Sequence, residues 1–142
     1  MATVVGTYRT KSLTPTPDNI YDGSLSRGNV LVAYDEYTFA ASDIGTVVQV
    51  CPTLPSEARI VDILINNAAL GSSVTLSIGD SDTATRYISA YGANSNTSTS
   101  LSVAAGRMYK VGTNDGDNII TITTAGAAAT GKVQITVLYA MI

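Results

Sequence analysis

Residues 73–78 read Ser-Val-Thr-Leu-Ser-Ile, with apolar and hydroxyl side chains in strict alternation. A period of two residues places Val74, Leu76 and Ile78 on one face of an extended strand and the hydroxyl side chains on the other. The segment is therefore predicted to be a β-strand that buries one face.

Similar segments lie on both sides of this strand, at residues 30–34, 37–39, 46–51, 58–66, 86–91, 107–111, 118–124 and 132–139. Glycine, asparagine and aspartate clusters separate them, as in Gly79-Asp-Ser-Asp82 and Asn114-Asp-Gly-Asp117. No segment shows a sustained helical period of apolar residues. Short strands at this spacing predict an all-β fold, an antiparallel β-sandwich or jelly roll of about eight strands.

Three of these segments carry more specific predictions. The segment 58–66 places Val61, Ile63 and Ile65 on one face and further apolar residues on the other, so we expect a central or covered strand. The segment Ile119–Thr124, connected through small residues to Val133–Tyr139, is expected to form a C-terminal hairpin.

The first 29 residues differ from the rest. Pro15 and Pro17 favour extended backbone before them, and the glycine and asparagine residues that follow favour turns. The sequence predicts two parts, an extended N-terminal arm at residues 1–29 and a β-sandwich at residues 30–142. An arm with little core of its own would become ordered on another surface, such as a neighbouring subunit.

The composition limits the classes of partner. Charged residues make up 13% of the chain, about half the usual share, and the net charge is −3. An acidic chain lacks the basic footprint that nucleic acid requires, and no apolar run reaches the length of a membrane span. We therefore expect neither a nucleic acid nor a membrane as partner. The neutral polar surface suits protein contacts, because neutral groups cost less to desolvate than charges.

The sequence offers little reactive chemistry. There is no histidine to activate a nucleophile, so the single cysteine, Cys51, is expected to be a small buried hydrophobic residue. No glycine-rich phosphate loop is present. Asp80 with Asp82 and Asp115 with Asp117 could ligate calcium, but solvated turn residues are the better interpretation. We expect no catalytic residues, no metal site, no cofactor and no enzymatic activity.

Tyrosine is the dominant aromatic residue, with eight Tyr against one Phe and no Trp. Its ring buries a large area while its hydroxyl remains available for hydrogen bonds, so it is common at interfaces. A role in capping a small β core is the competing interpretation. The residues proposed for protein interfaces are Tyr8, Arg9, Lys11, Tyr21, Arg27, Tyr34, Tyr37, Tyr87, Tyr91 and Tyr109.

Two stretches resemble a known family. Residues 73–88, Ser-Val-Thr-Leu-Ser-Ile-Gly-Asp-Ser-Asp-Thr-Ala-Thr-Arg-Tyr-Ile, resemble a segment of small structural proteins encoded beside capsid genes in tailed bacteriophages. Residues 117–139 are similar to their closing hairpin. The resemblance covers the C-terminal half from about residue 58, and residues 1–29 carry no part of it.

This resemblance implies a capsid cement, or decoration, protein with a jelly-roll-like fold. Such a protein would be made in the bacterial host cytoplasm, sit on the outside of the head and bridge major capsid protein subunits, as a homo-oligomer such as a dimer or trimer. It implies no catalytic residues. Two alternatives stay open, a phage tail or head fibre module and a carbohydrate-binding β-sandwich, although the chain shows neither fibre repeats nor an aromatic sugar platform.

Overall fold

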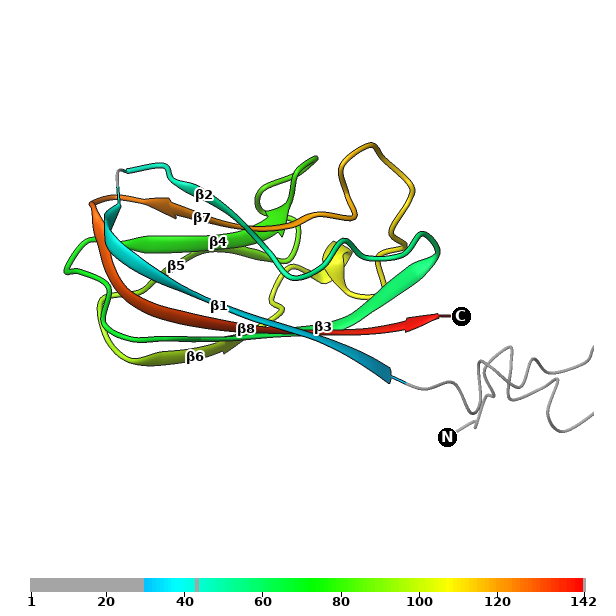
Figure 1. Ribbon diagram of the computed structural model, residues 1–142, viewed down its shortest axis with the longest axis horizontal. Helices are drawn as coiled ribbons and strands as arrows, with labels where there is room; N and C mark the ends of the chain where they lie inside the picture. The colour runs from blue at the N-terminus through cyan, green and yellow to red at the C-terminus, as the bar shows by residue number, and fades with distance from the viewer. Residues whose placement is uncertain (1–29, 43, 142) are drawn as a thin grey trace, which may run out of the picture.

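The structure is a computed structural model that describes residues 30–42 and 44–141 (Figure 1). The predicted N-terminal arm, with Tyr8, Arg9, Lys11, Tyr21 and Arg27, lies outside the described residues. The described residues contain no helix that is long and apolar enough to cross a membrane.

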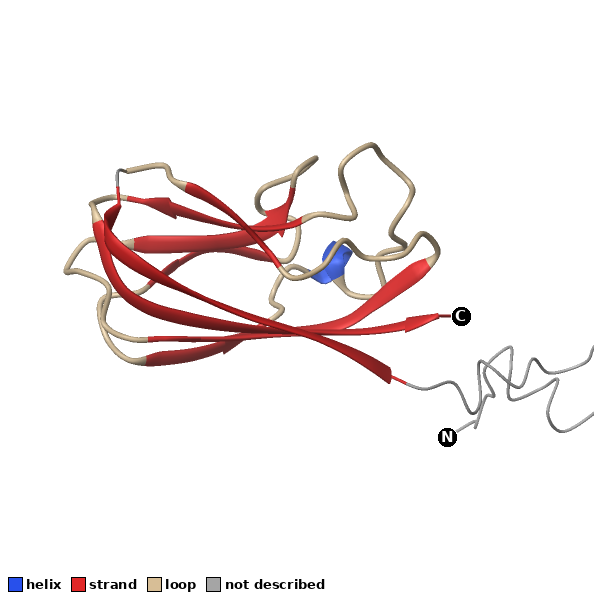
Figure 2. Ribbon diagram, in the orientation of Figure 1, coloured by secondary structure: helices blue, strands red, loops and turns tan. Residues whose placement is uncertain are grey.

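The described chain forms eight β-strands and one short 3₁₀ helix, η1 (Figure 2). Their bounds are β1 Val30–Ser42, β2 Val47–Val50, β3 Ala58–Asn67, β4 Thr75–Asp80, β5 Ile88–Gly92, β6 Thr97–Ser100, η1 Ala104–Gly106, β7 Ile120–Ala125 and β8 Ala129–Met141. The predicted all-β fold class is confirmed.

The strands form two four-stranded antiparallel sheets that pack as two layers (Figure 1). The first sheet has the order β1-β8-β3-β6, and the second has the order β2-β7-β4-β5. The chain changes sheet after every strand except between β4 and β5. This alternation of strands between two sheets is the jelly-roll arrangement, so the sandwich prediction is confirmed in its more specific form.

The core lies between the two sheets and follows from the alternation along each strand. In the first sheet, β8 buries Val133, Ile135 and Val137, and β3 sets Ile65 directly opposite Ile135. The second sheet contributes buried side chains that include Ile78, which is paired with Ile122 of β7. Because side chains alternate across a strand, the residues between these buried positions must face away from the core.

The segment 107–111 is not a strand, although the sequence predicted one. Its backbone follows β3, with the Met108 N–H donating to the Ile60 carbonyl at 2.7 Å and the Val111 N–H donating to the Ala58 carbonyl at 2.8 Å. Met108 has a φ of 61°, a left-handed conformation that interrupts an extended strand. The strand next to β3 is instead β6, whose Thr-Ser-Thr-Ser sequence contains no apolar residue to reveal it.

The predicted C-terminal hairpin is also wrong. β7 pairs with β2 and β4, whereas β8 pairs with β1 and β3, so the two strands belong to different sheets. The connection turns at Gly126, which has a φ of 87° and lies so close to Ser73 that a Cβ atom would sit 2.0 Å from its carbonyl oxygen. Such a turn carries the chain across the sandwich and does not fold it back within one sheet.

The two faces of β3 differ from the predicted ones because of a β-bulge between Ile60 and Asp62. The bulge shifts the alternation by one residue, so Ile60 is buried together with Ile63 and Ile65, and Val61 is only partly buried. The prediction that this strand is central is confirmed, because β3 lies between β8 and β6.

Adjacent residues on β3 provide a direct test of this assignment. We expect Ile63→Ala to lower the free energy of unfolding by about 2–5 kcal/mol, because it leaves a cavity in the core. Leu64→Ala, on the opposite face and 43% exposed, should change it by less than about 1 kcal/mol. Urea unfolding followed by circular dichroism measures both. Equal losses for the two variants would contradict the assignment of faces.

Candidate protein interface

The surface of the first sheet that points away from the core is the candidate interface, and we refer to it as the outer face. Val30, Val32 and Tyr34 of β1 alternate with core-facing residues and are 52%, 61% and 52% exposed. Leu64 of β3 is 43% exposed. Strand pairing places Tyr34 and Leu64 on either side of Thr136, so these side chains form one row across β1, β8 and β3.

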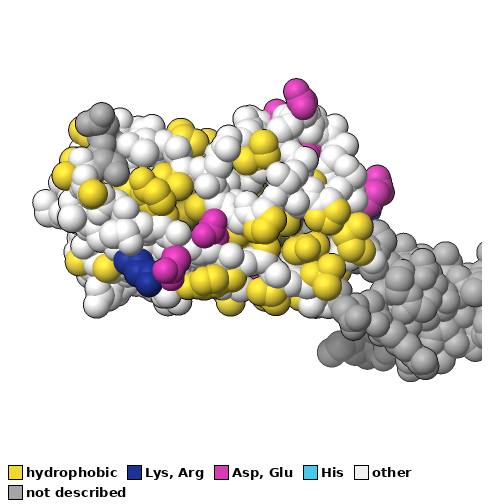
Figure 3. All heavy atoms as spheres, in the orientation of Figure 1, with side chains coloured by type: hydrophobic (Ala, Val, Ile, Leu, Met, Phe, Trp, Pro, Cys, Tyr) yellow, Lys and Arg dark blue, Asp and Glu magenta, His cyan; other side chains and the backbone are white. Residues whose placement is uncertain are grey.

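A mixed apolar and hydroxyl surface of this kind costs little to desolvate. In the side view of Figure 3, hydrophobic side chains lie in patches among a larger area of neutral polar groups and backbone, with few charged groups. On the outer face, Lys132 and Glu36 form an ion pair with an Nζ–Oε2 distance of 2.9 Å. The hydrogen bond from Lys132 holds the pKa of Glu36 below its ordinary value. The opposite charges of this pair cancel, so the pair adds no net charge to the surface.

Tyr34 is held in place on this face by two hydrogen bonds. Its hydroxyl donates to Glu36 Oε2 at 3.0 Å and accepts from Gln134 Nε2 at 2.9 Å. The hydroxyl group is therefore held by neighbours on β1 and β8 before any partner binds. A side chain that is already ordered loses less conformational entropy on binding, which makes Tyr34 a suitable anchor.

One end of the outer face contains a shallow open cavity of about 490 Å³. It is lined by Asn66, Asn67, Ala68, Asn96, Thr97, Ser98, Lys132 and Gln134. The lining residues carry amide and hydroxyl groups, although most of the surface that they expose to the cavity is apolar. The interface thus combines an apolar region near the start of β1 with a depression of mixed character at the other end of the strands.

The predicted interface tyrosines are distributed between the surface and the interior. Tyr34 and Tyr37 are exposed, the second by 38%. Tyr87 is fully buried, so it belongs to the core and offers no surface to a partner. Tyr91 is half-buried, and its hydroxyl donates to Asn67 Oδ1 at 2.8 Å beneath the cavity. Burial raises the pKa of both Tyr87 and Tyr91.

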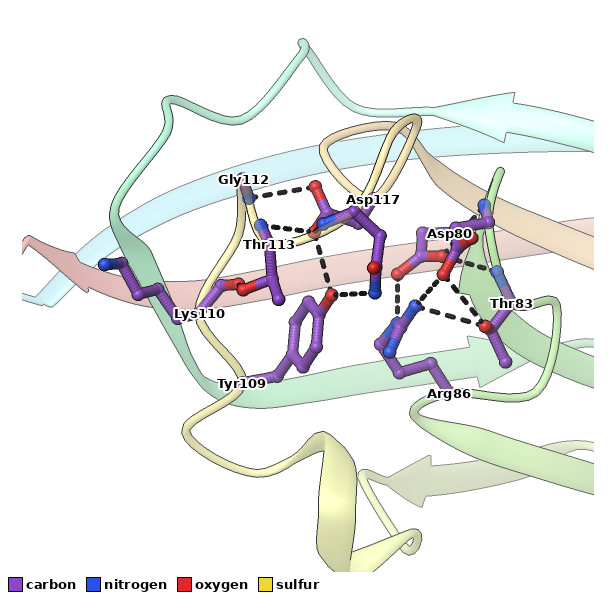
Figure 4. Close-up of polar contacts among 10 residues, drawn as sticks. Asp80, Thr83, Arg86, Tyr109, Lys110, Gly112, Thr113 and Asp117 are labelled. Atoms are coloured by element: carbon purple, nitrogen blue, oxygen red, sulfur yellow. Dashed lines mark hydrogen bonds and ion pairs between the residues drawn. The ribbon is translucent and has the colours of Figure 1, made fainter.

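Tyr109 belongs to a polar cluster that joins the loops at one end of the sandwich (Figure 4). Its hydroxyl donates to Asp117 Oδ2 at 2.8 Å, and the Arg86 guanidinium lies 4.0 Å from the centre of its ring. Arg86 also donates to Asp80 and Asp82, at 2.5 Å in each case. Burial lowers the pKa of Arg86, but the hydrogen bond and charge of Asp80 outweigh it, and the net pKa is raised.

These contacts tie the carboxylates of Asp80 and Asp117 to donors within the protein. Asp80 is 2% exposed, and its carboxylate accepts from Arg86 and from the backbone N–H groups of Asp82 and Thr83. Within residues 30–42 and 44–141, no group of three or more histidine, cysteine or acidic residues could hold a metal ion. The interpretation as solvated turn residues is wrong for Asp80 and Asp117, because both are buried.

Asp117 organises the loop before β7. It is 1% exposed, and its carboxylate accepts from the backbone N–H groups of Gly112, Thr113 and Asn114 at 2.9, 2.9 and 2.8 Å. Burial alone would raise the pKa of Asp117, but these hydrogen bonds and the Tyr109 hydroxyl lower it below its ordinary value of 3.8. The ionised form is therefore the one that the fold stabilises.

Asp117→Asn replaces one acceptor oxygen with an amide that opposes these donors. We expect it to lower the free energy of unfolding at pH 7 by about 1–3 kcal/mol. Because the folded pKa is depressed, the wild-type advantage is present above pH 3.8 and is lost as the pH falls through the folded pKa. Urea unfolding at pH 7 and at pH 3 measures the difference in the free energy of unfolding between the wild type and Asp117→Asn. We expect this difference to be smaller at pH 3. Asp115→Asn, at an exposed neighbour, is the control, and an equal loss there would contradict the account.

Cys51 follows β2 and is half-buried beside β1. Its N–H donates to Asp35 Oδ2 at 2.8 Å, and its Sγ lies 3.9 Å from the Ala33 carbonyl oxygen. Burial, with the nearby Asp35 carboxylate, raises the pKa of the Cys51 thiol from 9.0 to about 11. The residue packs against the core, as predicted, although it is not fully buried.

A raised pKa keeps this thiol protonated at neutral pH, and the thiolate is the reactive form. At pH 8, we expect native Cys51 to react with iodoacetamide at least about a hundredfold more slowly than the urea-unfolded chain, as a rise in pKa from 9.0 to about 11 requires. The native rate should rise with pH until about pH 11. Mass spectrometry of timed samples measures the rate. Rapid native alkylation at pH 8 would contradict the burial of the thiol.

Sequence reasoning missed most of the outer face. It selected tyrosines and basic residues, whereas Val30, Val32 and Leu64 supply much of the exposed apolar surface. One signal for this surface was present in the sequence, because the segment 58–66 carries apolar residues on both faces. A strand with one solvated face needs only one apolar face, so the second apolar face of this segment agrees with an exposed apolar surface that includes Leu64.

No protein-family model matches this sequence, and no curated protein matches it. Comparison with solved structures finds a chain of the cyanophage Pam1 capsid asymmetric unit, with a TM-score of 0.69 and 28% identity over 81% of this chain and 86% of that chain. The β-sandwich is similar to chains of phage capsids. The two chains are of similar length, since the match covers comparable shares of both.

Two other phage capsids contain chains with the same fold. A chain from the capsid of Ralstonia phage GP4 has a TM-score of 0.61 and 13% identity over 80% of this chain and 85% of that chain. A chain from the acid-stable capsid of Helicobacter pylori bacteriophage KHP30 has a TM-score of 0.58 and 18% identity, with 78% and 86% covered. These two matches show that the fold is shared. The 28% identical cyanophage chain supports a phage capsid-related protein with a structural role in the virion.

Proposed function

We propose that this protein is a capsid cement protein that binds the outside of a phage head and bridges major capsid protein subunits. The observation that carries the proposal is the 28% identity and matching length shared with a chain of the cyanophage Pam1 capsid. The outer face supports it independently, because it offers an apolar and hydroxyl surface with a preorganised tyrosine. The proposed role requires binding only and involves no catalytic step.

The outer face is the proposed contact with the shell. A specific interface buries about 800 Å² on each partner, and its energetic centre consists of a few buried apolar or aromatic anchors. Tyr34 and Leu64 lie in one row at the middle of the outer face and are the proposed anchors. Asn66 and Gln134, in the lining of the cavity, would hydrogen-bond to the same partner at the rim.

Bridging requires contact with more than one capsid subunit. Residues 1–29 directly precede β1, whose first residues lie on the outer face, and their basic and acidic residues sum to +1 in a chain of net charge −3. We propose that this segment extends from the bound sandwich to a neighbouring subunit. Two linked contacts bind more tightly than either alone, because the second becomes intramolecular. Symmetry repeats the same contact over the whole shell.

A comparison of opposite faces tests the proposed contact. We expect Leu64→Glu to weaken binding to phage heads that lack this protein by at least about tenfold, because it places an unpaired charge at a buried contact. Val47→Glu, which changes an exposed apolar residue (59%) on the second sheet, should bind as the wild type does. Co-sedimentation with heads over a range of protein concentrations gives both affinities.

The same heads provide the functional measurement. Wild-type protein should raise the temperature at which heads release DNA, and Leu64→Glu should fail to do so at concentrations where Val47→Glu succeeds. Each variant is first checked for unchanged unfolding in urea. Absence of wild-type binding to heads would refute the proposed function. Equal loss by both variants would refute the outer face as the contact.

A further inference from the structure

The cavity on the outer face is formed by a short side chain between two longer ones. β3 lies between β8 and β6, and Ala68 directly follows it. On one side, the Ala68 N–H donates to the Lys132 carbonyl of β8 at 3.0 Å. On the other side, the Ala69 N–H donates to Asn96 Oδ1 at 3.0 Å. Since Ala68, Lys132 and Asn96 all line the cavity, the Ala68 methyl group is its floor between longer walls.

The neighbouring row of the sheet adds polar side chains. Strand pairing sets Asn66 directly between Gln134 of β8 and Ser98 of β6, and all three residues line the cavity. Asn66 is exposed, and its side-chain amide makes no hydrogen bond within residues 30–42 and 44–141. An amide carries both donors and an acceptor, so Asn66 can offer both to a ligand.

Two further amides of the lining are oriented by the protein itself. The Ala69 N–H occupies Asn96 Oδ1, which leaves the Asn96 Nδ2 group as a donor. Gln134 Nε2 donates to the Tyr34 hydroxyl at 2.9 Å, which leaves Gln134 Oε1 as an acceptor. Donors and acceptors therefore lie side by side, and two of the three amides are ordered before a ligand binds, which lowers the entropy cost of binding.

The charges at the cavity select a neutral ligand. Among the described residues that line it, Lys132 alone is charged, and its Nζ lies 2.9 Å from Glu36 Oε2. An anion would have to compete with Glu36 for Lys132, and a cation would be repelled by Lys132. A ligand that suits this lining is neutral, carries groups that both donate and accept, and presents C–H groups to the apolar surface.

An aromatic side chain stands beside the cavity. Tyr34 is 52% exposed, and its hydroxyl is bonded to the lining residue Gln134. A tyrosine ring can pack against the C–H groups of a sugar, which is the platform that the sequence did not reveal. The sequence could not reveal it, because Tyr34 and Gln134 are 100 residues apart and meet only in the folded sheet.

We propose that this cavity is a binding site for a neutral sugar. The sugar ring would lie over Ala68, with its hydroxyl groups bonded to Asn66, Asn96 and Gln134 and with Tyr34 at its edge. An extended peptide matches less well, because its N–H and C=O groups pair with the open edge of a strand, whereas these groups surround a hollow on the face of a sheet. The cavity is shallow and open, so a monosaccharide should bind with a dissociation constant of about 1–10 mM.

Nuclear magnetic resonance of the isotope-labelled full chain tests the site. The probes are glucose, galactose, mannose and N-acetylglucosamine, each added to about 50 mM, well above the expected dissociation constant. We expect at least one of them to shift the side-chain amide signals of Asn66, Asn96 and Gln134 until they saturate. Signals from the second sheet should not move. Absence of a saturable shift with every probe would overturn the inference.

Two variants alter the cavity by different physical means. Asn66→Ala removes hydrogen bonds and should weaken sugar binding by at least about tenfold. Ala68→Leu fills the hollow and should abolish the shifts. Asn94→Ala is the matched control, because it removes an exposed asparagine between β5 and β6 that is not among the described lining residues, and it should bind as the wild type does. Backbone spectra establish that each variant is folded. Unchanged binding by Asn66→Ala and Ala68→Leu, or an equal loss with Asn94→Ala, would overturn the inference.

This inference does not depend on the proposed function, since the titration uses the free chain. A sugar and a capsid subunit would compete for Asn66 and Gln134, so the site is open wherever the outer face is uncovered. If no sugar binds but the chain binds and stabilises heads, only the sugar site is wrong. If a sugar binds as expected but heads are not bound, only the cement proposal is wrong.

Discussion

The alternation of side chains along β8 is the constraint on which the rest of the structure depends. β8 pairs with β1 on one side and with β3 on the other, so it fixes the register of three strands. Val133, Ile135 and Val137 point into the sandwich and bind the two sheets together through their buried apolar surface. Thr136 and Leu138 must then point outward. The core and the outer face are thus two consequences of one alternating sequence.

The few charged residues are arranged so that they leave this face neutral. Asp80, Arg86 and Asp117 are occupied by one another, by Tyr109 and by backbone N–H groups at the loop end of the sandwich (Figure 4). These contacts hold in place loops that contain few apolar residues. The outer face is built mainly from valine, leucine, threonine, asparagine and tyrosine, which can be removed from water at low cost. In the proposed function, this sheet would hold another protein by shape and neutral contacts.

The sequence predicted the fold class because period-two alternation is a strong local signal. Residues 73–78 and 132–139 alternate so regularly that their buried faces could be assigned correctly. It could not reveal β6, because the Thr-Ser-Thr-Ser sequence at residues 97–100 has no apolar period and is held by backbone pairing with β3. It also could not place β7 and β8 in different sheets, since that choice is made by the turn at Gly126 and by pairing partners distant in the chain.

The candidate interface was less predictable for a physical reason. Tyr87 and Tyr34 have the same residue type, but one fills the core and the other lies on the surface. Whether the side chain of a strand residue is buried or exposed depends on the register of the strand. A β-bulge such as that at Ile60–Asp62 changes the register without a local sequence signal. Exposed apolar residues become recognisable as an interface only when the buried ones are known.

The central claim is that the first sheet, through its outer face, is the surface that meets a phage capsid. Cryo-electron microscopy of phage heads carrying the bound protein tests this most directly. The account predicts density for the sandwich on the outside of the shell, with Tyr34 and Leu64 against capsid protein and the second sheet turned toward solvent. Density that places β2, β7, β4 and β5 against the shell, or heads without the sandwich, would contradict it.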